Sequence, residues 1–552
     1  MLRDARTLND ADVLDCDLCI IGGGAAGLTL ARDMIASRLR VILMESGGLT
    51  ADAATQSLYA GNNLGVPYER PQTARSRFLG GSTNCWGGWC RPLDPIDFET
   101  RDYMPMSGWP FGRQELQHFY ERTHDLIGLG DFDYDPAVWD GVLSASGAGL
   151  LPVTGEEVIN VISRLTAPAR LGVMFRPELE GSDNVTILLN ANATEIETDA
   201  MGGKIVSVRG ATLSGKQFTI KPRYTVLAAG GIENARLLLA SNRQQALGLG
   251  NGYDLVGRYF MDHPRLAPTR VSMANMARHR RLYDSTMELT QRMIANEGSP
   301  VAAHLAPSEE AQRRHRLPNS RSYLTASYYG SMTNAYSALK GVRQVLNGRR
   351  KFGIERKDVM AELRRSLPLL VANAPSVALA VLDHKMKFSF KQREFFLETV
   401  IEPIPNRDSR VTLSGERDRL GMPTVNIDWR FTAKDKDNFA RTHAFIRDEM
   451  HRQGLLLTTG TTSEAAQDWP SRVRWCWHHM GTTRMDDNPK EGVVDRDCRV
   501  HGIGNLFIAG SSVFPTAGSD TPTMTIIALA LRMSEKLKNE MATTVKSSMA
   551  AA

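Results

Sequence analysis

The sequence predicts an α/β protein, α+β overall, in which a Rossmann-like domain is joined to a second domain built on an antiparallel sheet. Three observations lead to this prediction. An apolar strand near the start runs into a glycine cluster, two later strands also end in glycine, and short β-rich segments recur through the middle of the chain. With 552 residues the chain is too long for one simple core and suits two packed lobes.

The first element is a strand–helix–strand unit. Leu14–Ile21 is an apolar, β-rich run that ends at Gly22, and Ala25–Ser37 has apolar residues at helical spacing. Arg40–Met44 is a second β-rich run, and Glu45 closes it. About 30 residues in this order are typical of the opening of a dinucleotide-binding fold.

Gly22, Gly24 and Gly27 have the spacing G-x-G-x-x-G. The first glycine allows a tight turn, the second lets the backbone approach a pyrophosphate, and the third lets helix and strand pack closely. The spacing alone also fits a flexible loop, but here it joins a strand to a helix. Glu45, about 20 residues further on, suits the ribose hydroxyls. These residues therefore predict a dinucleotide site.

Two later strand ends indicate which dinucleotide binds. Val226–Gly231 is a strand that ends in a double glycine before a helix at Ile232–Ala240, and Leu506–Gly510 is another such strand. Three strand ends that converge on one site suit a long cofactor lying across the sheet. A flavin disulfide reductase would need a second glycine-rich unit for NADPH, but the glycines at 248–252 follow a helix instead of a strand. FAD is therefore the expected cofactor.

The remaining elements are less regular. The segment 183–228 predicts a meander that returns to the first domain, whereas 265–400 is polar and helical in its middle. The predicted strands and one further helix are Val185–Leu189, Thr194–Glu197, Ile205–Arg209, Gln217–Ile220, Tyr224–Ala228, Lys387–Val400, Arg410–Leu413 and the helix Ala433–Met450.

Composition excludes several classes of protein. The net charge of +5 is small for this length, so no nucleic-acid partner is expected. Six cysteines are too few for a disulfide scaffold. The longest apolar stretch, Leu367–Leu382, is interrupted by Pro368 and Pro375, which argues against a transmembrane segment. With no visible secretory signal, we expect a reduced, cytoplasmic protein, and no metal site is expected.

Together these motifs resemble the glucose–methanol–choline (GMC) oxidoreductase family, and among its members the pyranose-oxidase-like bacterial ones. The resemblance implies an FAD enzyme that oxidises the CH–OH group of a sugar, glycoside or polyol-like alcohol to a carbonyl. It rests on the N-terminal unit and on Ser76–Asn84, Gly257–Pro264, Pro405–Leu413, Trp477–Thr482, Gly492–Asp495, Asn505–Gly510 and Pro515–Thr525.

In that family the histidine of an H-x-x-G-T motif accepts the alcohol proton, which implies that His478 is the catalytic base. A neutral imidazole suits this task because its ordinary pKa is about 6.5. On the residues alone, His478 could equally be a structural histidine in a tryptophan-rich segment. His479 is expected to be a neighbour that orients it. The family usually has Asn or His before the following proline, whereas this chain has Thr521, which can donate a hydrogen bond but cannot act as a base.

Cys85 and Cys90 are separated by four residues after a glycine pair, as in flavin disulfide reductases, so that class stays as an alternative. In pyranose-oxidase-like members a histidine in this loop is bonded covalently to the flavin. Cys85 occupies that place, and the resemblance therefore implies a noncovalent flavin. A third alternative is a catalytically degenerate flavoprotein, which Thr521 alone suggests.

We expect an FAD domain assembled from residues 1–100, 181–265 and 475–540, a substrate domain from 101–180 and 266–474, and a flexible tail at 541–552. The electron acceptor (oxygen, a quinone or a redox protein) and the oligomeric state, including a homo-oligomer, stay open. The expected FAD-binding residues are Gly22, Gly24, Ala26, Gly27, Glu45, Ser46, Gly80, Ser82, Asn84, Cys85, Ala193, Ala229, Gly230, Ala509, Gly510, Thr523 and Met524.

Overall fold

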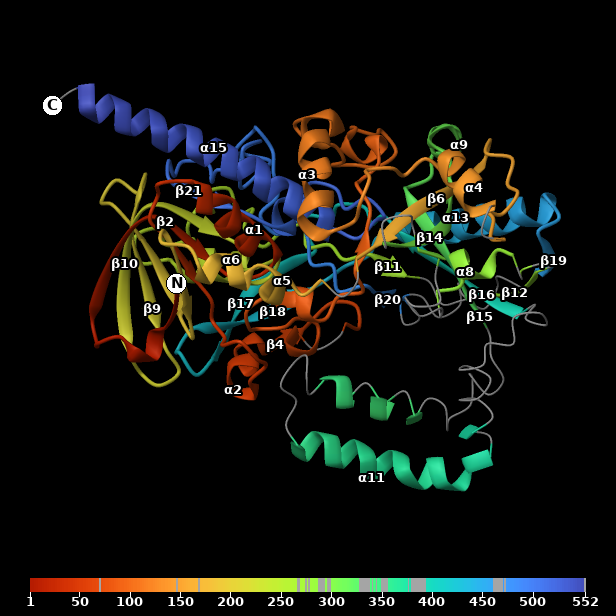
Figure 1. The fold of residues 1–552 in the computed structure, drawn as a ribbon, viewed down its shortest axis with the longest axis horizontal. Coiled ribbons are helices and arrows are strands. Elements are labelled where there is room, and N and C mark those ends of the chain that lie inside the picture. The colour runs from red at the N-terminus through yellow and green to blue at the C-terminus, as the bar shows by residue number, and fades with distance from the viewer. Residues whose placement is uncertain are drawn as a thin grey trace.

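The computed structural model describes most of the chain, as a set of three sheets with helices packed around them (Figure 1). The described residues are 1–550 without 69–70, 145–146, 167–168, 266–268, 274–275, 277, 286–292, 295–298, 327–337, 340, 344, 349–355, 376, 379–393, 460–469 and 471–472.

The first sheet has eight strands, and six of them run parallel. It lies at the left of Figure 1. Strand β10 has two neighbours at its carboxyl end, β2 and β21, so the turns that follow these three strands meet at one edge. The strands in spatial order are β1 (Leu2–Asp4), β7 (Val185–Leu189), β3 (Val41–Met44), β2 (Asp12–Ile21), β10 (Gln217–Leu227), β9 (Ile205–Ala211) and β8 (Asn192–Thr198), with β21 (Leu506–Ile508) beside β10.

Both faces of the parallel part are covered, as parallel sheets require. All four residues of β3 are buried, and helix α1 (Ala25–Asp33) packs between the sheet and the long helix α15 (Thr523–Ala550). Helix α15 extends beyond the end near Leu537 that the sequence suggested. It runs along the top of Figure 1 to the C-terminus.

Three short helices from the segment 101–180 pack on the first sheet. Helix α3 (Gln117–Ile127) contacts α15, and α5 (Leu171–Met174) and α6 (Arg176–Glu180) contact α1. Their apolar side chains, such as Tyr120 and Leu179, belong to the core of the first sheet. Residues 101–180 were expected to lie in the substrate domain, but these helices pack with the core of the first sheet. Amphipathicity does not indicate which sheet a helix covers.

The predicted meander also differs from the observed strands. Strand β7 pairs in parallel with β3, so the antiparallel run contains only β8, β9 and β10. In addition, Gln217–Ile220 and Tyr224–Ala228 form one strand through Pro222. Proline is tolerated there because β9 pairs with residues 217–220 and β21 with 225–227, which leaves no ladder partner on that side at Pro222.

The second sheet has ten strands and is antiparallel, which confirms the predicted fold class. It occupies the right half of Figure 1. Its main strands in spatial order are β19 (Leu456–Thr459), β12 (Thr269–Met273), β16 (Glu394–Ile401), β15 (Ser320–Ala326), β14 (Pro300–Pro307), β6 (Val158–Leu165) and β5 (Trp89–Cys90); β11 (Pro264–Arg265) joins β16 and β20 (Arg474–Trp475), and β13 (Met293–Ile294) joins β14.

Several of these strands come from the stretch that the sequence analysis interpreted as polar and helical. Strand β15 begins with Ser320 and Arg321, and both are fully buried. Arg321 is balanced by ion pairs with Asp94 at 2.5 Å and Asp520 at 2.6 Å. The polar sequence did not predict a buried strand, because the charge of Arg321 is neutralised by aspartates that are distant in the sequence. Of the predicted strand Lys387–Val400, residues 387–393 lie outside the described part, and β16 continues to Ile401.

A small third sheet lies beside the first. It contains β17 (Arg410–Arg417), β18 (Pro423–Asp428) and β4 (Gly61–Asn63), and helix α7 (Glu233–Ala240) packs against it. Helix α13 (Ala433–Arg452) covers the second sheet and begins at a capping box formed by Thr432 and Asp435.

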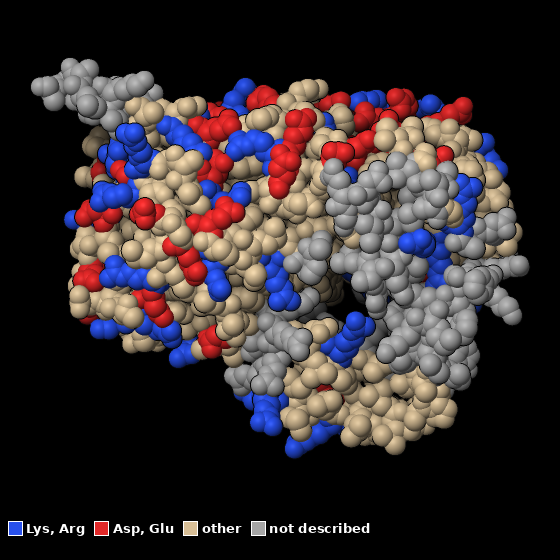
Figure 2. Space-filling view, viewed as in Figure 1, with Lys and Arg blue, Asp and Glu red and all other residues tan. Residues whose placement is uncertain are grey.

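Helix α11 (Arg356–Ala372) lies at the bottom of Figure 1. Among the described residues, no helix is both long and apolar enough to cross a membrane. On the face drawn in Figure 2, basic and acidic residues are interspersed over the half of the molecule that holds the first sheet.

Candidate functional site

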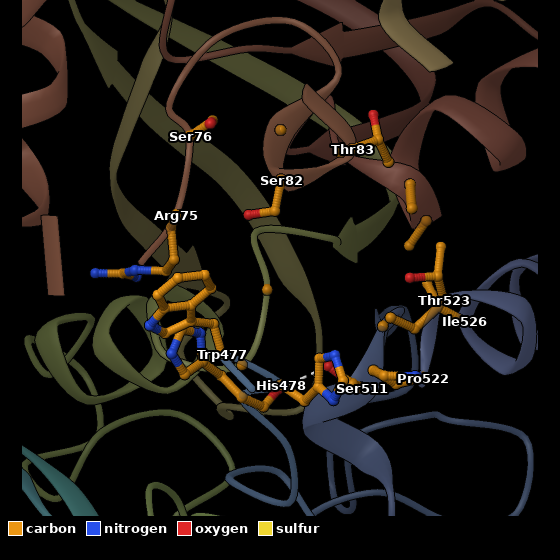
Figure 3. A pocket seen from close by; sticks show the side chains of 18 of the residues that line it. Arg75, Ser76, Ser82, Thr83, Trp477, His478, Ser511, Pro522, Thr523 and Ile526 are labelled. Atoms are coloured by element: carbon orange, nitrogen blue, oxygen red, sulfur yellow. Dashed lines mark hydrogen bonds between the residues drawn. The ribbon is translucent and has the colours of Figure 1, made fainter. Parts of the chain in front are cut away.

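A cavity of about 680 Å³ is lined by residues of both large sheets. The turns after β2, β10 and β21 form one wall, and residues of β5, β11, β15 and β20 form the opposite one. In Figure 3, Ser76 and Ser82 lie on one side of this cavity, Trp477 and His478 on another, and Pro522 and Thr523 on a third. The site is therefore assembled from segments that are distant in the sequence.

Three glycines leave open space in the first wall. A Cβ built on Gly24, Gly230 or Gly510 would meet nothing within 4 Å, and all three residues line the cavity. Gly230 and Gly510 also have φ angles of +89° and +117°, which favour glycine. Gly27 has a different role, because a Cβ there would lie 1.9 Å from the carbonyl oxygen of Gly22. It lets α1 approach the end of β2 and does not line the cavity.

Glu45 lies buried at the end of β3 and lines the cavity. Its carboxylate accepts hydrogen bonds from the backbone N–H of Gly23 at 2.9 Å and of Gly47 at 2.7 Å. Burial raises the pKa of Glu45, and these N–H donors oppose that rise. Each oxygen has one further lone pair, so the carboxylate can still accept hydrogen bonds from ribose hydroxyls.

The loop that follows residue 76 covers the same wall. Ser82 and Cys85 line the cavity, whereas Gly80 and Asn84 do not. The Asn84 amide instead donates to the carbonyl oxygens of Leu79 at 3.0 Å and Gly81 at 2.9 Å, and so holds the loop in shape. Asn84 is thus better explained as a structural residue of this loop.

The segment that carries the two histidines is fixed by backbone contacts. The Thr482 hydroxyl donates to the carbonyl oxygen of Gly231, and Met480 pairs with Met261. A Cβ on Gly231 would lie 2.3 Å from the carbonyl oxygen of His479. The turn after β10 and the histidine segment can therefore approach this closely only because residue 231 is glycine.

The half-buried ring of His478 lines the cavity. Its Nδ1 lies 2.8 Å from Nδ1 of His263, and Nε2 of His263 lies 2.9 Å from the carbonyl oxygen of Gly518. Burial lowers the pKa of His478 well below the usual value, and repulsion from His263 and His479 lowers it further. The ring is therefore neutral at neutral pH.

His479 also lines the cavity but has a more enclosed ring. It stacks on Phe260 with the ring centroids 6.0 Å apart. Burial, with a smaller contribution from Arg75, lowers the pKa of His479 to about 3. Among the described residues no hydrogen bond joins His479 to the His478 ring, whereas His263 contacts that ring.

Thr521 lines the cavity just before α15. Its hydroxyl donates to the carbonyl oxygen of Trp89 at 2.7 Å. The hydroxyl hydrogen is thus engaged in this bond, and the Thr521 oxygen can only accept a hydrogen bond from a further partner. Thr523 lines the cavity as well, whereas Met524 is fully buried behind it.

The sequence analysis missed Asp262 and His263. Asp262 is fully buried and accepts backbone N–H groups from three consecutive residues, Cys476, Trp477 and His478, and from His263. It also accepts the hydroxyl of Tyr68. The available signal was the segment Gly257–Pro264, which was noted for its family resemblance but was assigned no role.

The structure brings most of the expected site residues into one cavity. Those that line it are His478, His479, Thr521, Gly22, Gly24, Ala26, Glu45, Ser46, Ser82, Cys85, Ala193, Ala229, Gly230, Ala509, Gly510 and Thr523. Those that do not are Gly27, Gly80, Asn84 and Met524.

The opposite wall is made of larger side chains. Trp89, Trp475 and Tyr323 present aromatic rings, and Arg265 adds a guanidinium group that pairs with Glu398. Aromatic faces pack well on the C–H faces of rings such as sugars, and guanidinium groups donate to hydroxyl oxygens. This wall therefore suits a polar substrate that has apolar faces.

The residues of the first wall fit FAD. The turns that contain Gly24, Gly230 and Gly510 follow neighbouring parallel strands, and their glycines leave space for a ligand. Helix α1 begins directly after Gly24. Backbone N–H groups at such a terminus bind phosphates. Glu45 lies at the end of the adjacent strand, where ribose hydroxyls are usually bound.

Comparison with known proteins agrees with this fit. A family model described as "FAD dependent oxidoreductase" matches residues 17–247, and one described as "GMC oxidoreductase" matches residues 405–530. Similar curated proteins include paromamine 6'-oxidase of Streptomyces fradiae, 24% identical over 98% of this chain and 94% of that protein. The fructose dehydrogenase large subunit of Gluconobacter japonicus is 22% identical over 96% and 99%.

Solved structures share the fold. Pyridoxine 4-oxidase from Mesorbium loti is 19% identical, with a TM-score of 0.56 over 94% of this chain and 99% of that one. Formate oxidase is 16% identical, with a TM-score of 0.55 over 97% and 99%. Since the two family models fall on the two parts of the chain that build the first wall, the cofactor is FAD, and the chain is an FAD-dependent oxidoreductase whose residues 405–530 are similar to the GMC oxidoreductases.

Proposed function

We propose that the protein oxidises a CH–OH group of a sugar, glycoside or polyol-like alcohol to a carbonyl, with His478 as the base that takes the hydroxyl proton. The observation that carries this proposal is that the His478 ring lines the same cavity as the glycine turns after β2, β10 and β21. Burial also lowers the pKa of His478, which favours the neutral ring. FAD would be held by the glycine turns after β2, β10 and β21 and by Glu45, and when bound it would supply the hydride acceptor, N5.

The base is needed because an alcohol releases hydride readily only when its O–H proton leaves at about the same time. A general base must be unprotonated and within hydrogen-bond reach of that proton, and for histidine the unprotonated form is the neutral ring. Burial keeps His478 neutral, and its backbone is held by Asp262. Thr521 can accept a hydrogen bond from the substrate but its own hydrogen is directed at Trp89.

The substrate class is supported by the relatives and by the second wall. The similar proteins are named for acting on paromamine, fructose and, in Mycolicibacterium austroafricanum, 2-methyl-1,2-propanediol; the last protein is 23% identical over 94% of each chain. All three names describe hydroxyl-bearing molecules. Aromatic rings with one guanidinium group are compatible with such substrates.

The main alternative was a flavin disulfide reductase using Cys85 and Cys90. The two residues are separate thiols whose Sγ atoms donate to the carbonyl oxygens of Ser82 and Gly88. Burial raises the pKa of Cys90 to about 12, and a thiol that stays protonated is a poor nucleophile. These observations favour the alcohol oxidoreductase.

We also propose the two-domain division expected from the sequence, with an FAD domain formed by 1–100, 181–265 and 475–540. The helices at 117–127 and 171–180 are added to it because they pack in its core. Residues 266–474 then supply most of the substrate domain.

The experiment is anaerobic reduction of the FAD-loaded protein by a panel of sugars, glycosides and aliphatic and aromatic alcohols, followed by flavin absorbance. We expect bleaching by at least one sugar-like or polyol alcohol and none by NADPH alone. Bleaching by NADPH without any alcohol would contradict the proposal and favour a reductase. A loaded protein inert to the entire panel would favour the degenerate flavoprotein.

A further inference from the structure

The segment Met261–Pro264 contacts His478 in two different ways. Asp262 receives the backbone N–H groups of residues 476–478, at 3.3, 2.9 and 2.9 Å. Three successive N–H groups can point at one carboxylate here because Trp477 has a φ angle of +62°. The next residue, His263, contacts the ring of His478. One dipeptide therefore holds both the main chain and the side chain of the proposed base.

The hydrogen-bond chain around His263 determines where each proton lies. Its Nε2 faces the carbonyl oxygen of Gly518 at 2.9 Å, and a carbonyl can only accept, so Nε2 carries a hydrogen. Burial lowers the pKa of His263, although the charge of Asp262 opposes this. In the neutral ring Nδ1 is then an acceptor, and the group facing it at 2.8 Å, Nδ1 of His478, must donate.

We infer that His263 is a positioning residue that fixes His478 as the tautomer with hydrogen on Nδ1, leaving the lone pair of Nε2 free to take the substrate proton. This inference rests on the proposed function, because a free lone pair matters only if His478 is the base. The opposite tautomer would place a hydrogen on Nε2, and the ring could then only donate to the alcohol.

The packing around His263 leaves little freedom for a different orientation of its ring relative to His478. His263 is fully buried and its ring meets the His478 ring nearly at a right angle, with the centroids 5.0 Å apart and an interplanar angle of 88°. The loop that carries Gly518 is itself fixed, since Gly518 has a φ angle of +59° and packs against Leu93 and Asp97. A flip of the His263 ring would break its bond to Gly518.

The test compares two substitutions of His263. His263→Phe keeps an aromatic ring and removes the acceptor. His263→Asn places its side-chain oxygen close to where Nδ1 was, and so restores an acceptor. His443→Phe is the matched control, because His443 is a buried histidine whose ring bonds Thr269 and Thr399, and none of these three residues lines the cavity. FAD content and circular dichroism select the variants that are folded and loaded.

The first measurement is the 15N NMR spectrum of histidine-labelled, FAD-loaded protein without substrate, in which the His478 signals are those lost in His478→Gln. We expect hydrogen on Nδ1 and a bare Nε2 in the parent, in His263→Asn and in His443→Phe, but hydrogen on Nε2 in His263→Phe. A parent protein with hydrogen on Nε2 of His478 would overturn the inference, whatever the panel of alcohols shows.

The second measurement is single-turnover flavin reduction by an alcohol found in that panel. We expect His263→Phe to be slower by about 10²-fold, the scale of a lost general base, and His263→Asn to recover to within about tenfold of the parent. Equal loss in both variants with an unchanged tautomer would show that His263 only fills space. Because the NMR result needs no alcohol, failure of this inference and failure of the proposed function can be told apart.

Discussion

The two walls of the cavity are built on different principles. The wall formed by the turns after β2, β10 and β21 presents main chain and glycine, and three of its glycines leave open space where a side chain would stand. The wall formed by β5, β11, β15 and β20 presents tryptophan, tyrosine and arginine side chains. The first wall suits a cofactor that many proteins share, whereas the second suits a substrate that differs among relatives.

This difference explains which parts of the site are visible in the sequence. Main-chain recognition requires glycines at fixed short spacing, as in Gly22, Gly24 and Gly27, so it leaves a local motif. Side-chain recognition depends on which strands become neighbours. Arg265 and Trp475 are brought together by the pairing of β11 with β20 across more than two hundred residues.

The largest effect expected tests the main-chain wall. Gly24 has a φ angle of −87°, which any residue can adopt, and a Cβ there would point into the cavity without a clash. Gly24→Val should therefore fold but exclude FAD. Flavin absorbance per protein after purification and refolding with added FAD measures this. Losing the N-cap glycine should cost only about 1 kcal/mol of stability.

Gly252→Val is the matched control for that variant. Gly252 is exposed, and a Cβ there would also meet nothing within 4 Å. It should bind FAD as the parent does. A fully loaded Gly24→Val protein would mean that the cofactor does not approach this turn, and that the comparison of the two walls is mistaken.

The next effect concerns His478, which lines the cavity together with residues of both walls. His478→Ala should retain FAD, since the glycine turns are untouched, but flavin reduction should slow by about 10²-fold or more. Stopped-flow reduction under anaerobic conditions, with the same substrate for both proteins, measures the rate. A near-normal rate in a loaded variant would remove His478 from the mechanism and direct attention to His479.

The pH dependence of the parent protein gives a smaller effect. A free imidazole has a pKa of about 6.5, and burial, helped by His263 and His479, lowers the pKa of His478 below that value. The folded protein therefore keeps the base neutral, and active, at pH values where a free histidine would be protonated. We expect the reduction rate to stay level from pH 8 to 6.5 and to fall only below that. Half-loss of the rate at or above pH 6.5 would contradict the lowered pKa.

The first sheet was largely predictable because each of its motifs is local. The strand before Gly22, the helix after it and the strand before Glu45 all lie within about 30 residues. Two strands of this sheet differ from the prediction: β7 pairs in parallel with β3 instead of joining the meander, and β10 is one strand where the sequence predicted two, divided at Pro222. That proline is tolerated only because no strand pairs with it on one side, and a pairing gap cannot be seen in a single sequence.

The second sheet and the base's partners were less predictable because they depend on contacts between distant residues. Arg321 is buried in β15 because Asp94 and Asp520 neutralise it. His263 lies 215 residues before His478, yet the rings are in contact. Neither pairing leaves a periodic pattern, so the sequence indicated the proposed base but not the residue that contacts its ring.

The smallest effect tests Thr521, the position where the chain departs from the pattern of the GMC oxidoreductases. The hydroxyl donates to the carbonyl oxygen of Trp89, so it can offer the substrate only a lone pair, and Thr521→Val removes a single neutral hydrogen bond. Such a bond is worth about 0.5–1.5 kcal/mol, which corresponds to about tenfold in rate at most. Single-turnover reduction should thus slow far less in Thr521→Val than in His478→Ala, measured at one pH with one substrate. Equal losses of about 10²-fold or more would show that both residues act on the substrate as a unit, and that the single-base mechanism is wrong.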